Sequence, residues 1–311
     1  MSSRTRSKKQ EPPSLIPSLT EDIILDILAR VPSCYHPILS LVSKHFRSLV
    51  ASHELEERRS LLGCTEHRLY VVLYNTVKHI YQLYILRRKA NGSHRLVRIP
   101  SLPNMPADGI LVTAGSRIYV FGRLNSVISI DFRSQTVHLL PIQTQMWEPE
   151  KTTPEMMSGC MVMMAGKMYT RDGLNSFVYD PKESRWETDK TLNMFEWDYG
   201  CVVDDVLYYY DYHGSVFRAY NPKECSWVVV NGLENFVAQM RLISNWFYIG
   251  SYGGKLAMFF WNTFGTRVIR CAEISLERRQ GKEIWGKVEW CDDVLFHSDD
   301  LFVTQTVDVI L

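Results

Sequence analysis

Two different patterns of apolar residues divide the chain. Between Leu19 and Val50 apolar residues recur every three or four positions, the spacing of helices that bury one face. From about residue 67 onward, short apolar and aromatic runs are separated by glycine, proline, asparagine and aspartate, as in strands joined by tight turns. The sequence therefore predicts a small helical segment followed by a β-rich body.

The helical segment is interrupted by two prolines. Pro32 ends the first predicted helix and Pro37 is placed to open the second, which carries apolar residues from Ile38 to Val50. About fifty residues in short helices bury this much apolar surface poorly. The segment therefore either packs on the rest of the chain or is completed by a partner protein, and the pattern alone does not decide between the two.

Aromatic residues place the boundary between the two parts. Residues 1–66 contain only Tyr35 and Phe46 from the Phe, Tyr and Trp set, whereas all eight tryptophans come after residue 146. Large flat side chains suit the half-buried surface of a sheet. The change from helix to strand is therefore expected near Cys64–Arg68.

The body contains an internal repeat. FVYDPKESRW, residues 177–186, and FRAYNPKECSW, residues 217–227, are near-copies whose tryptophans lie 41 residues apart. Gly159 and Gly200 open the preceding hairpins with the same offset. One unit is therefore four short strands in about 40 residues, which is the size of a β-propeller blade.

Weaker copies of this unit flank the two clear ones. They lie at residues 115–141, at 67–100 and from 245 to about 290. Five units can be counted in this way. A sixth would have to use the C-terminal residues 291–311, joined by a strand near residue 67 to close the ring.

Charge and cysteine content indicate which partners and which compartment to expect for the protein. The 35 Lys and Arg against 34 Asp and Glu give a net charge of +1, so no global field attracts nucleic acid or an anionic membrane. Seven scattered cysteines without a C-x-x-C pair, and no apolar run long enough to span a bilayer, favour an intracellular protein of the cytoplasm or nucleus. The basic residues of segment 1–13 predict a disordered tail.

Catalytic motifs are absent from the sequence. It has no G-x-S-x-G elbow, no H-E-x-x-H and no phosphate-binding glycine–lysine loop, and its nine histidines are dispersed. The acidic doublets Asp204-Asp205, Asp292-Asp293 and Asp299-Asp300 are interpreted as solvated turns. We therefore expect no enzyme, no catalytic residue, no metal and no cofactor, and no nucleic-acid binding.

The helical segment resembles an F-box. Leu19, Ile23, Ile27-Leu28 and Val31-Pro32, followed by LSLVSKHFRSLV at residues 39–50, fall where that family has its motif. The repeats resemble kelch repeats, with paired glycines at Gly253-Gly254. Thr20 departs from the family's usual proline and Phe46 from its common tryptophan.

The resemblance implies a plant-type F-box/kelch-repeat protein. Its fold would be a mainly β, kelch-type propeller of five to six four-stranded units at residues 67–311, preceded by an α-helical F-box domain at 14–60. Its function would be that of a substrate receptor, which binds the Skp-type adaptor of a cullin-RING ubiquitin ligase and presents a target protein. Two alternatives are a kelch scaffold that joins no ligase, given Thr20, and a propeller enzyme.

The resemblance also indicates two sets of contact residues. The residues expected to bind the adaptor are Leu19, Ile23, Ile27, Leu28, Val31, Pro32, Leu41 and Val42. Kelch-type propellers usually bind targets on one rim, formed by the loops before each first strand and between the second and third strands. The residues expected on that rim are Arg123, Arg171, Asn175, Trp197, Tyr212, Arg241 and Tyr252.

Overall fold

The chain forms two compact units in the computed structural model, residues 1–65 and 66–311. The residues that the structure describes are 19–99, 110–114, 117–122, 126–131, 136–141, 160–173, 175–244, 246–261, 268–296 and 301–311. The predicted tail at residues 1–13 and the rim residue Arg123 lie outside them.

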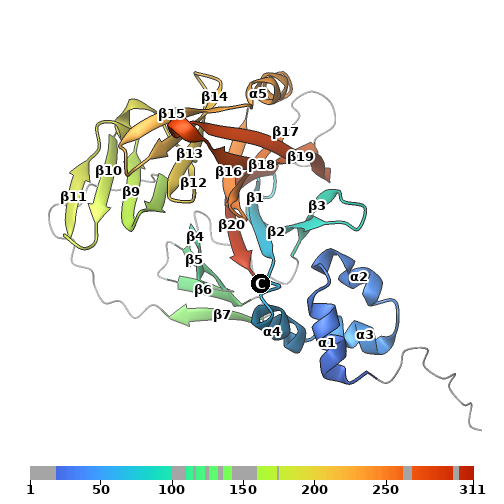
Figure 1. Cartoon of the computed structure of the whole chain (residues 1–311). Coiled ribbons are helices and arrows are strands. Elements are labelled where there is room, and N and C mark those ends of the chain that lie inside the picture. The colour runs from blue at the N-terminus through green and yellow to red at the C-terminus, as the bar shows by residue number, and fades with distance from the viewer. Residues whose placement is uncertain are drawn as a thin grey trace, which may run out of the picture. The chain divides into compact units, whose positions relative to one another are not determined.

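The first unit is helical (Figure 1). It consists of α1 (Glu21–Ala29), a 3-10 turn (Ser33–Tyr35), α2 (His36–Leu39), α3 (Lys44–Val50) and α4 (His53–Leu61). The second helix expected from Pro37 to Val50 is in fact two, because Ser43 accepts a hydrogen bond from the Phe46 backbone N–H and begins α3 afresh. No described helix has the length and apolarity needed to cross a membrane.

A small core holds these helices together. Leu25, Leu28 and Ala29 of α1 pack with Leu49 and Leu55 from α3 and α4. The buried guanidinium of Arg59 on α4 donates from Nη1 to the carbonyl oxygens of Ala29, at 3.0 Å, and Val31, at 2.8 Å. These bonds satisfy carbonyls at the C-terminal end of α1 and fix α4 against it.

The second unit contains five four-stranded antiparallel blades among its described residues. Blade 1 consists of β20 (Leu301–Ile310), β1 (His67–Asn75), β2 (Ile80–Arg88) and β3 (His94–Arg98). Blade 2 consists of β4 (Ile110–Ala114), β5 (Arg117–Gly122), β6 (Ser126–Asp131) and β7 (Thr136–Pro141). Blade 3 consists of β8 (Cys160–Met164), β9 (Lys167–Asp172), β10 (Asn175–Asp180) and β11 (Arg185–Thr188). Blade 4 consists of β12 (Cys201–Val203), β13 (Val206–Asp211), β14 (Val216–Asn221) and β15 (Ser226–Asn231). Blade 5 consists of β16 (Phe247–Tyr252), β17 (Lys255–Trp261), β18 (Val268–Arg278) and β19 (Ile284–Phe296), and α5 (Glu234–Arg241) precedes it.

The two clear repeats have the same structure. Tyr179 pairs with Trp186 across β10 and β11, and the rings lie 5.0 Å apart. Tyr220 and Trp227, 41 residues further on, pair in the same way across β14 and β15, with rings 5.1 Å apart. In both blades the Asp or Asn before the proline accepts a backbone hydrogen bond that closes the turn. The repeat therefore encodes one blade, as predicted.

The C-terminal strand completes the first blade. β20 pairs antiparallel with β1 from His67 opposite Ile310 to Asn75 opposite Leu301, so the two ends of this unit lie side by side (Figure 1). The strand expected near residue 67 thus joins the C-terminal residues. These residues do not form a sixth blade, because their partners β1–β3 already supply the other three strands.

The first strands of the blades lie next to one another. β12 contacts β8 and β16, and β20 contacts β16 and β4, so the order is β8, β12, β16, β20, β4. Gly250 of β16 faces Thr306 of β20 so closely that a Cβ at this position would overlap the threonine hydroxyl. A short parallel pairing of β15 with β19 also joins blades 4 and 5. The body is a β-propeller whose first strands line its centre.

Candidate binding surfaces

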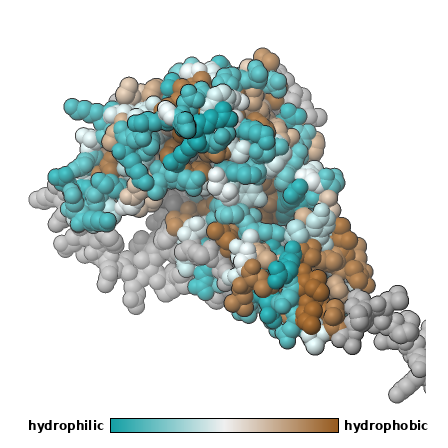
Figure 2. Space-filling model, in the orientation of Figure 1, coloured by the Kyte–Doolittle hydropathy of each residue, from teal (hydrophilic) through white to brown (hydrophobic). Residues whose placement is uncertain are grey.

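One face of the helical unit is apolar and exposed. Ile23 and Ile27 lie one turn apart on α1, on the side away from its buried residues, and Ile27 is 52% exposed. Leu41, at 76%, and Val42 follow α2 and are also exposed. Figure 2 shows apolar surface over these helices. Clustered exposed apolar residues of this kind are typical of interaction surfaces.

The residues expected to bind the adaptor do not all lie on this face. Leu19, Ile23, Ile27, Pro32, Leu41 and Val42 are exposed, and Val31 is half-buried. Leu28 is only 2% exposed and belongs to the core with Leu25 and Leu49. The expectation that Leu28 contacts the adaptor is therefore corrected. Helix α1 has two apolar stripes, and Leu28 lies on the stripe that faces the core. Tyr35 and Ile38 are further exposed apolar residues that the sequence analysis did not include.

Two residues expected on the propeller rim are buried. Trp197 is fully buried, and its indole N–H donates to the hydroxyl of Ser176 at 2.9 Å. Arg171 is 2% exposed and donates from Nη1 to the carbonyl of Phe195 at 3.2 Å. Both side chains join blade 3 to the segment that leads into blade 4. The structure therefore places them in the interior of the body and away from the rim surface.

Of the other described rim residues three are exposed and Tyr252 is half-buried, and the four do not share one end of the propeller. Asn175 begins β10, Tyr212 follows β13 and Arg241 ends α5, and these three are exposed near the rim loops. Tyr252 ends β16, the first strand of blade 5, next to the Gly253-Gly254 turn. This turn joins first to second strands, so Tyr252 lies at the opposite end from the expected rim.

An aromatic row that the sequence analysis missed occupies the rim between blades 5 and 1. The rings of Trp246 and Trp261 stack 4.1 Å apart, and Phe302 meets Trp261 edge-on at 4.5 Å. Tyr74 pairs with Phe302 across β1 and β20, and its ring lies 4.7 Å from that of Tyr81. These five side chains come from distant parts of the chain, so only their position at strand ends could have indicated them.

Two features of the described residues concern reactive chemistry. No group of three or more His, Cys, Asp or Glu residues within the described part of the chain is placed to hold a metal ion. Burial raises the pKa of the Cys160 thiol to about 11, which makes it a poor nucleophile. Asp204-Asp205 forms a turn as predicted, and Asp299-Asp300 lies outside the described residues.

The doublet Asp292-Asp293 was interpreted wrongly. Asp292-Asp293 lies within strand β19, where neighbouring side chains point to opposite faces. Asp292 contacts His94 at 2.8 Å, whereas Asp293 pairs with Arg270 at 2.6 Å. The doublet therefore contributes to the contacts of blade 5 and does not form a solvated turn.

Comparison with known proteins agrees with both halves of the structure. Residues 16–58 match the F-box domain model, and residues 140–295 match the model described as FKB95, Kelch-repeats domain. The chain is 40% identical to F-box/kelch-repeat protein At4g38940 of Arabidopsis thaliana, over 98% of this chain and 97% of that one. It is 34% identical to F-box/kelch-repeat protein At4g39240 of the same plant, over 94% and 90%.

A helical unit with an exposed apolar face, joined to a propeller of kelch-like blades, is the architecture of an F-box domain followed by a kelch-repeat domain. The chain belongs to the family of F-box/kelch-repeat proteins. This confirms the resemblance drawn from the motif at residues 19–50 and from the 41-residue repeat.

Proposed function

We propose that the protein is the substrate-recognition subunit of an SCF-type ubiquitin ligase. The observation that carries this proposal is the exposed apolar face of the helical unit, which lies within the F-box match. Ile23, Ile27, Leu41 and Val42 would be covered by a Skp-type adaptor, because burying them removes apolar surface from water.

The propeller would hold the target protein. Neither half would perform the chemistry of ubiquitin transfer, which belongs to other subunits of such a ligase. The contribution of this chain is proximity: holding a target lysine near the charged conjugating enzyme raises its effective concentration. The rim residues Asn175, Tyr212 and Arg241 and the aromatic row at Trp261 and Phe302 are the contacts that we propose for the target.

The adaptor interaction is tested with purified proteins. We expect the wild-type chain to bind a Skp-type adaptor in biolayer interferometry, and Ile27→Asp plus Leu41→Asp to weaken binding by about 30-fold or more, the effect of losing about 2 kcal/mol at a hot spot. Val77→Asp is the control, because Val77 is an equally exposed apolar residue on the β1–β2 turn of the body.

The same experiment separates the receptor from a free-standing scaffold. If the folded wild-type chain binds no adaptor, the ligase role is wrong and the propeller acts as an interaction scaffold. If Val77→Asp weakens binding as much as the double variant does, the adaptor contacts a different surface from the one proposed.

A further inference from the structure

The hairpin of β2 and β3 is unusually basic. Residues 67–107 contain no Asp or Glu, although the whole chain has almost equal numbers of acidic and basic residues. The same stretch contains seven Lys and Arg. Five of them lie on or beside the hairpin, and we call these five the basic hairpin: Arg87, Arg88, Lys89, Arg95 and Arg98.

The basic hairpin is exposed and contains no acidic residue of its own. All five side chains are exposed, and none forms an ion pair with any residue that the structure describes. Arg87 stands directly opposite Arg95 across the two strands. Like charges at directly opposite positions destabilise a sheet. This placement therefore works against the stability of blade 1.

The positive charges also act on one another. The pKa of Arg87 lies below its ordinary value, first because the group is partly desolvated and then because Arg68 and Arg95 are near. Tyr70 acts in the opposite direction. No carboxylate contributes to the shift of Arg87. The guanidinium therefore sits in a positive local field.

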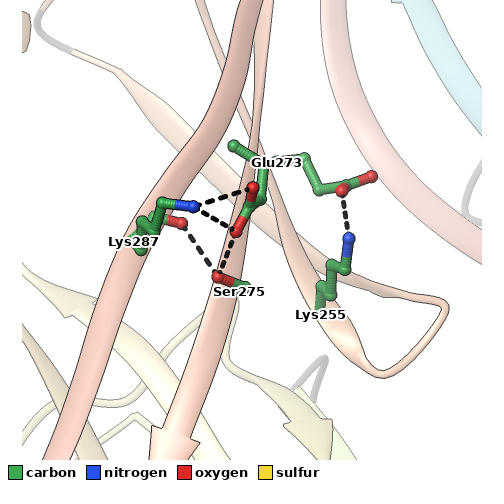
Figure 3. Close-up of polar contacts among 5 residues, drawn as sticks. Lys255, Glu273, Ser275 and Lys287 are labelled. Atoms are coloured by element: carbon green, nitrogen blue, oxygen red, sulfur yellow. Dashed lines mark hydrogen bonds and ion pairs between the residues drawn. The ribbon is translucent and has the colours of Figure 1, made fainter.

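Several cations on the strands of other blades have acidic partners. On blade 5, Lys255 pairs with Glu273 at 2.5 Å, and Lys287 lies 3.2 Å from Glu289, which also accepts from the Ser275 hydroxyl (Figure 3). Further pairs are Lys167 with Asp180 and Arg218 with Asp211 on blades 3 and 4, and Arg270 with Asp293 on blade 5. A cluster of five cations with no such pair among the described residues is therefore a particular feature of the β2–β3 hairpin.

We propose that the basic hairpin binds an acidic segment, rich in Asp and Glu, of the target protein. This inference rests on the proposed role of the body as the target-binding half. Four of the five cations are arginines, whose planar guanidinium groups bind carboxylates through two parallel hydrogen bonds. The segment would supply the negative charge that this stretch of the chain lacks.

The arrangement favours a run of carboxylates over nucleic acid. The cations spread along two exposed strands, from Arg87 to Lys89 and from Arg95 to Arg98, which suits several single charges in an extended peptide. Single-stranded nucleic acid would also need aromatic rings on which bases stack. The flanking aromatic residue Tyr84, opposite Arg98, is buried.

The test measures binding of a fluorescent peptide of about ten glutamates to the whole chain by anisotropy, at about 50 and about 300 mM NaCl, since exposed charge pairs are screened by salt. We expect binding that weakens with salt, and at least about tenfold weaker binding by Arg87→Gln plus Arg95→Gln, as the loss of two charge-assisted contacts implies. The matched control is Lys182→Gln plus Lys223→Gln, which removes two exposed lysines from equivalent turns of blades 3 and 4 and should leave binding nearly unchanged.

A second measurement separates binding from folding. Neutralising Arg87 and Arg95 relieves their repulsion, so the melting temperature of that variant should equal or exceed the wild-type value. A fall in melting temperature would mean that the two arginines serve the fold, and would overturn the proposal. Equal loss of peptide binding in the lysine control would also overturn the proposal. Tighter binding of a single-stranded oligonucleotide than of the peptide would do the same.

The peptide-binding experiment and the adaptor-binding experiment can fail independently of each other. Ile27→Asp plus Leu41→Asp should bind the peptide as the wild type does, and Arg87→Gln plus Arg95→Gln should bind the adaptor normally. Peptide binding without adaptor binding would refute the ligase role and leave the acidic-ligand surface intact. Adaptor binding without peptide binding would refute the basic hairpin alone.

Discussion

Nδ1 of His94 lies 2.8 Å from Oδ2 of Asp292, although 198 residues separate the two in the sequence. The same carboxylate oxygen accepts from the backbone N–H of His94 at 2.8 Å, and the imidazole stacks on Trp290 at 3.7 Å. Since β3 belongs to blade 1 and β19 to blade 5, these contacts connect the first and last blades along their outer strands.

Removing this carboxylate should loosen the seam between the two blades. We expect Asp292→Ala to lower the free energy of unfolding of the body by about 1–3 kcal/mol, because it leaves two donors of the partly buried His94 without their acceptor. Asp293→Ala is the matched control: its pair with Arg270 is on the surface, so the loss should stay within about 1 kcal/mol. Urea unfolding followed by tryptophan fluorescence measures both. Equal losses would contradict the assignment of the seam to Asp292.

The sequence predicted the blades well because their signals are local. A turn such as Asp180-Pro181-Lys182 and an aromatic pair such as Tyr179 and Trp186 lie within ten residues of each other, so a repeat exposes them. The contact of Asp292 with His94 joins residues far apart in the chain, and no local pattern could reveal it. For the same reason the aromatic row at Trp246 and Phe302 was missed.

The binding surfaces could be predicted only in part. Helical spacing placed Ile27 and Leu28 on one apolar face of the helix. It could not tell which of two neighbouring apolar stripes on that face packs against the core. Arginine and tryptophan are frequent in interfaces, which is why both were expected on the rim. Arg171 and Trp197 are buried instead, where they donate hydrogen bonds to the Phe195 carbonyl and the Ser176 hydroxyl. Both errors concern the direction of a side chain, which depends on the packing of elements distant in sequence.

Neighbouring residues on α1 should therefore respond differently to truncation. Leu28→Ala should lower the stability of the helical unit by about 2–5 kcal/mol, because it leaves a cavity between α1, α3 and α4. Ile27→Ala should change stability by less than about 0.5 kcal/mol and weaken adaptor binding instead, since its side chain is exposed. Thermal unfolding by circular dichroism, with adaptor binding measured in parallel, distinguishes them. Loss of stability in Ile27→Ala would place that residue in the core.

The rim residues should divide in the same manner. Trp197→Ala should destabilise the body by about 3–5 kcal/mol, because a fully buried ring and its hydrogen bond to Ser176 are lost. Tyr212→Ala should cost less than about 1 kcal/mol, since the ring is largely exposed beside Tyr210 and Phe247. Chemical denaturation of the two variants measures the difference. A Trp197→Ala variant as stable as the wild type would show that this tryptophan is not a core residue.

Thiol labelling should follow burial and pH. With its pKa raised by burial to about 11, Cys160 has about one thiol in a thousand ionised at pH 8, and only the thiolate reacts with iodoacetamide. Exposed Cys225 should therefore be labelled first, while at pH 8 Cys160 and the buried Cys271 react far more slowly until urea exposes them. Labelling of native Cys160 should rise about tenfold per pH unit up to about pH 11.

The same shift affects stability with a definite sign. Because the folded state keeps the Cys160 thiol protonated, its contribution to stability is present below the ordinary pKa of 9.0 and is lost as the pH rises towards about 11.

The labelling prediction is checked by mass spectrometry of labelled peptides, which gives the labelling rate of each cysteine at each pH. The urea-unfolded chain is the reference for full reactivity. If native Cys160 reacted at pH 8 as fast as Cys225, its thiol would have to be open to solvent, and the packing of β8 beside β12 at the centre of the propeller would be wrong.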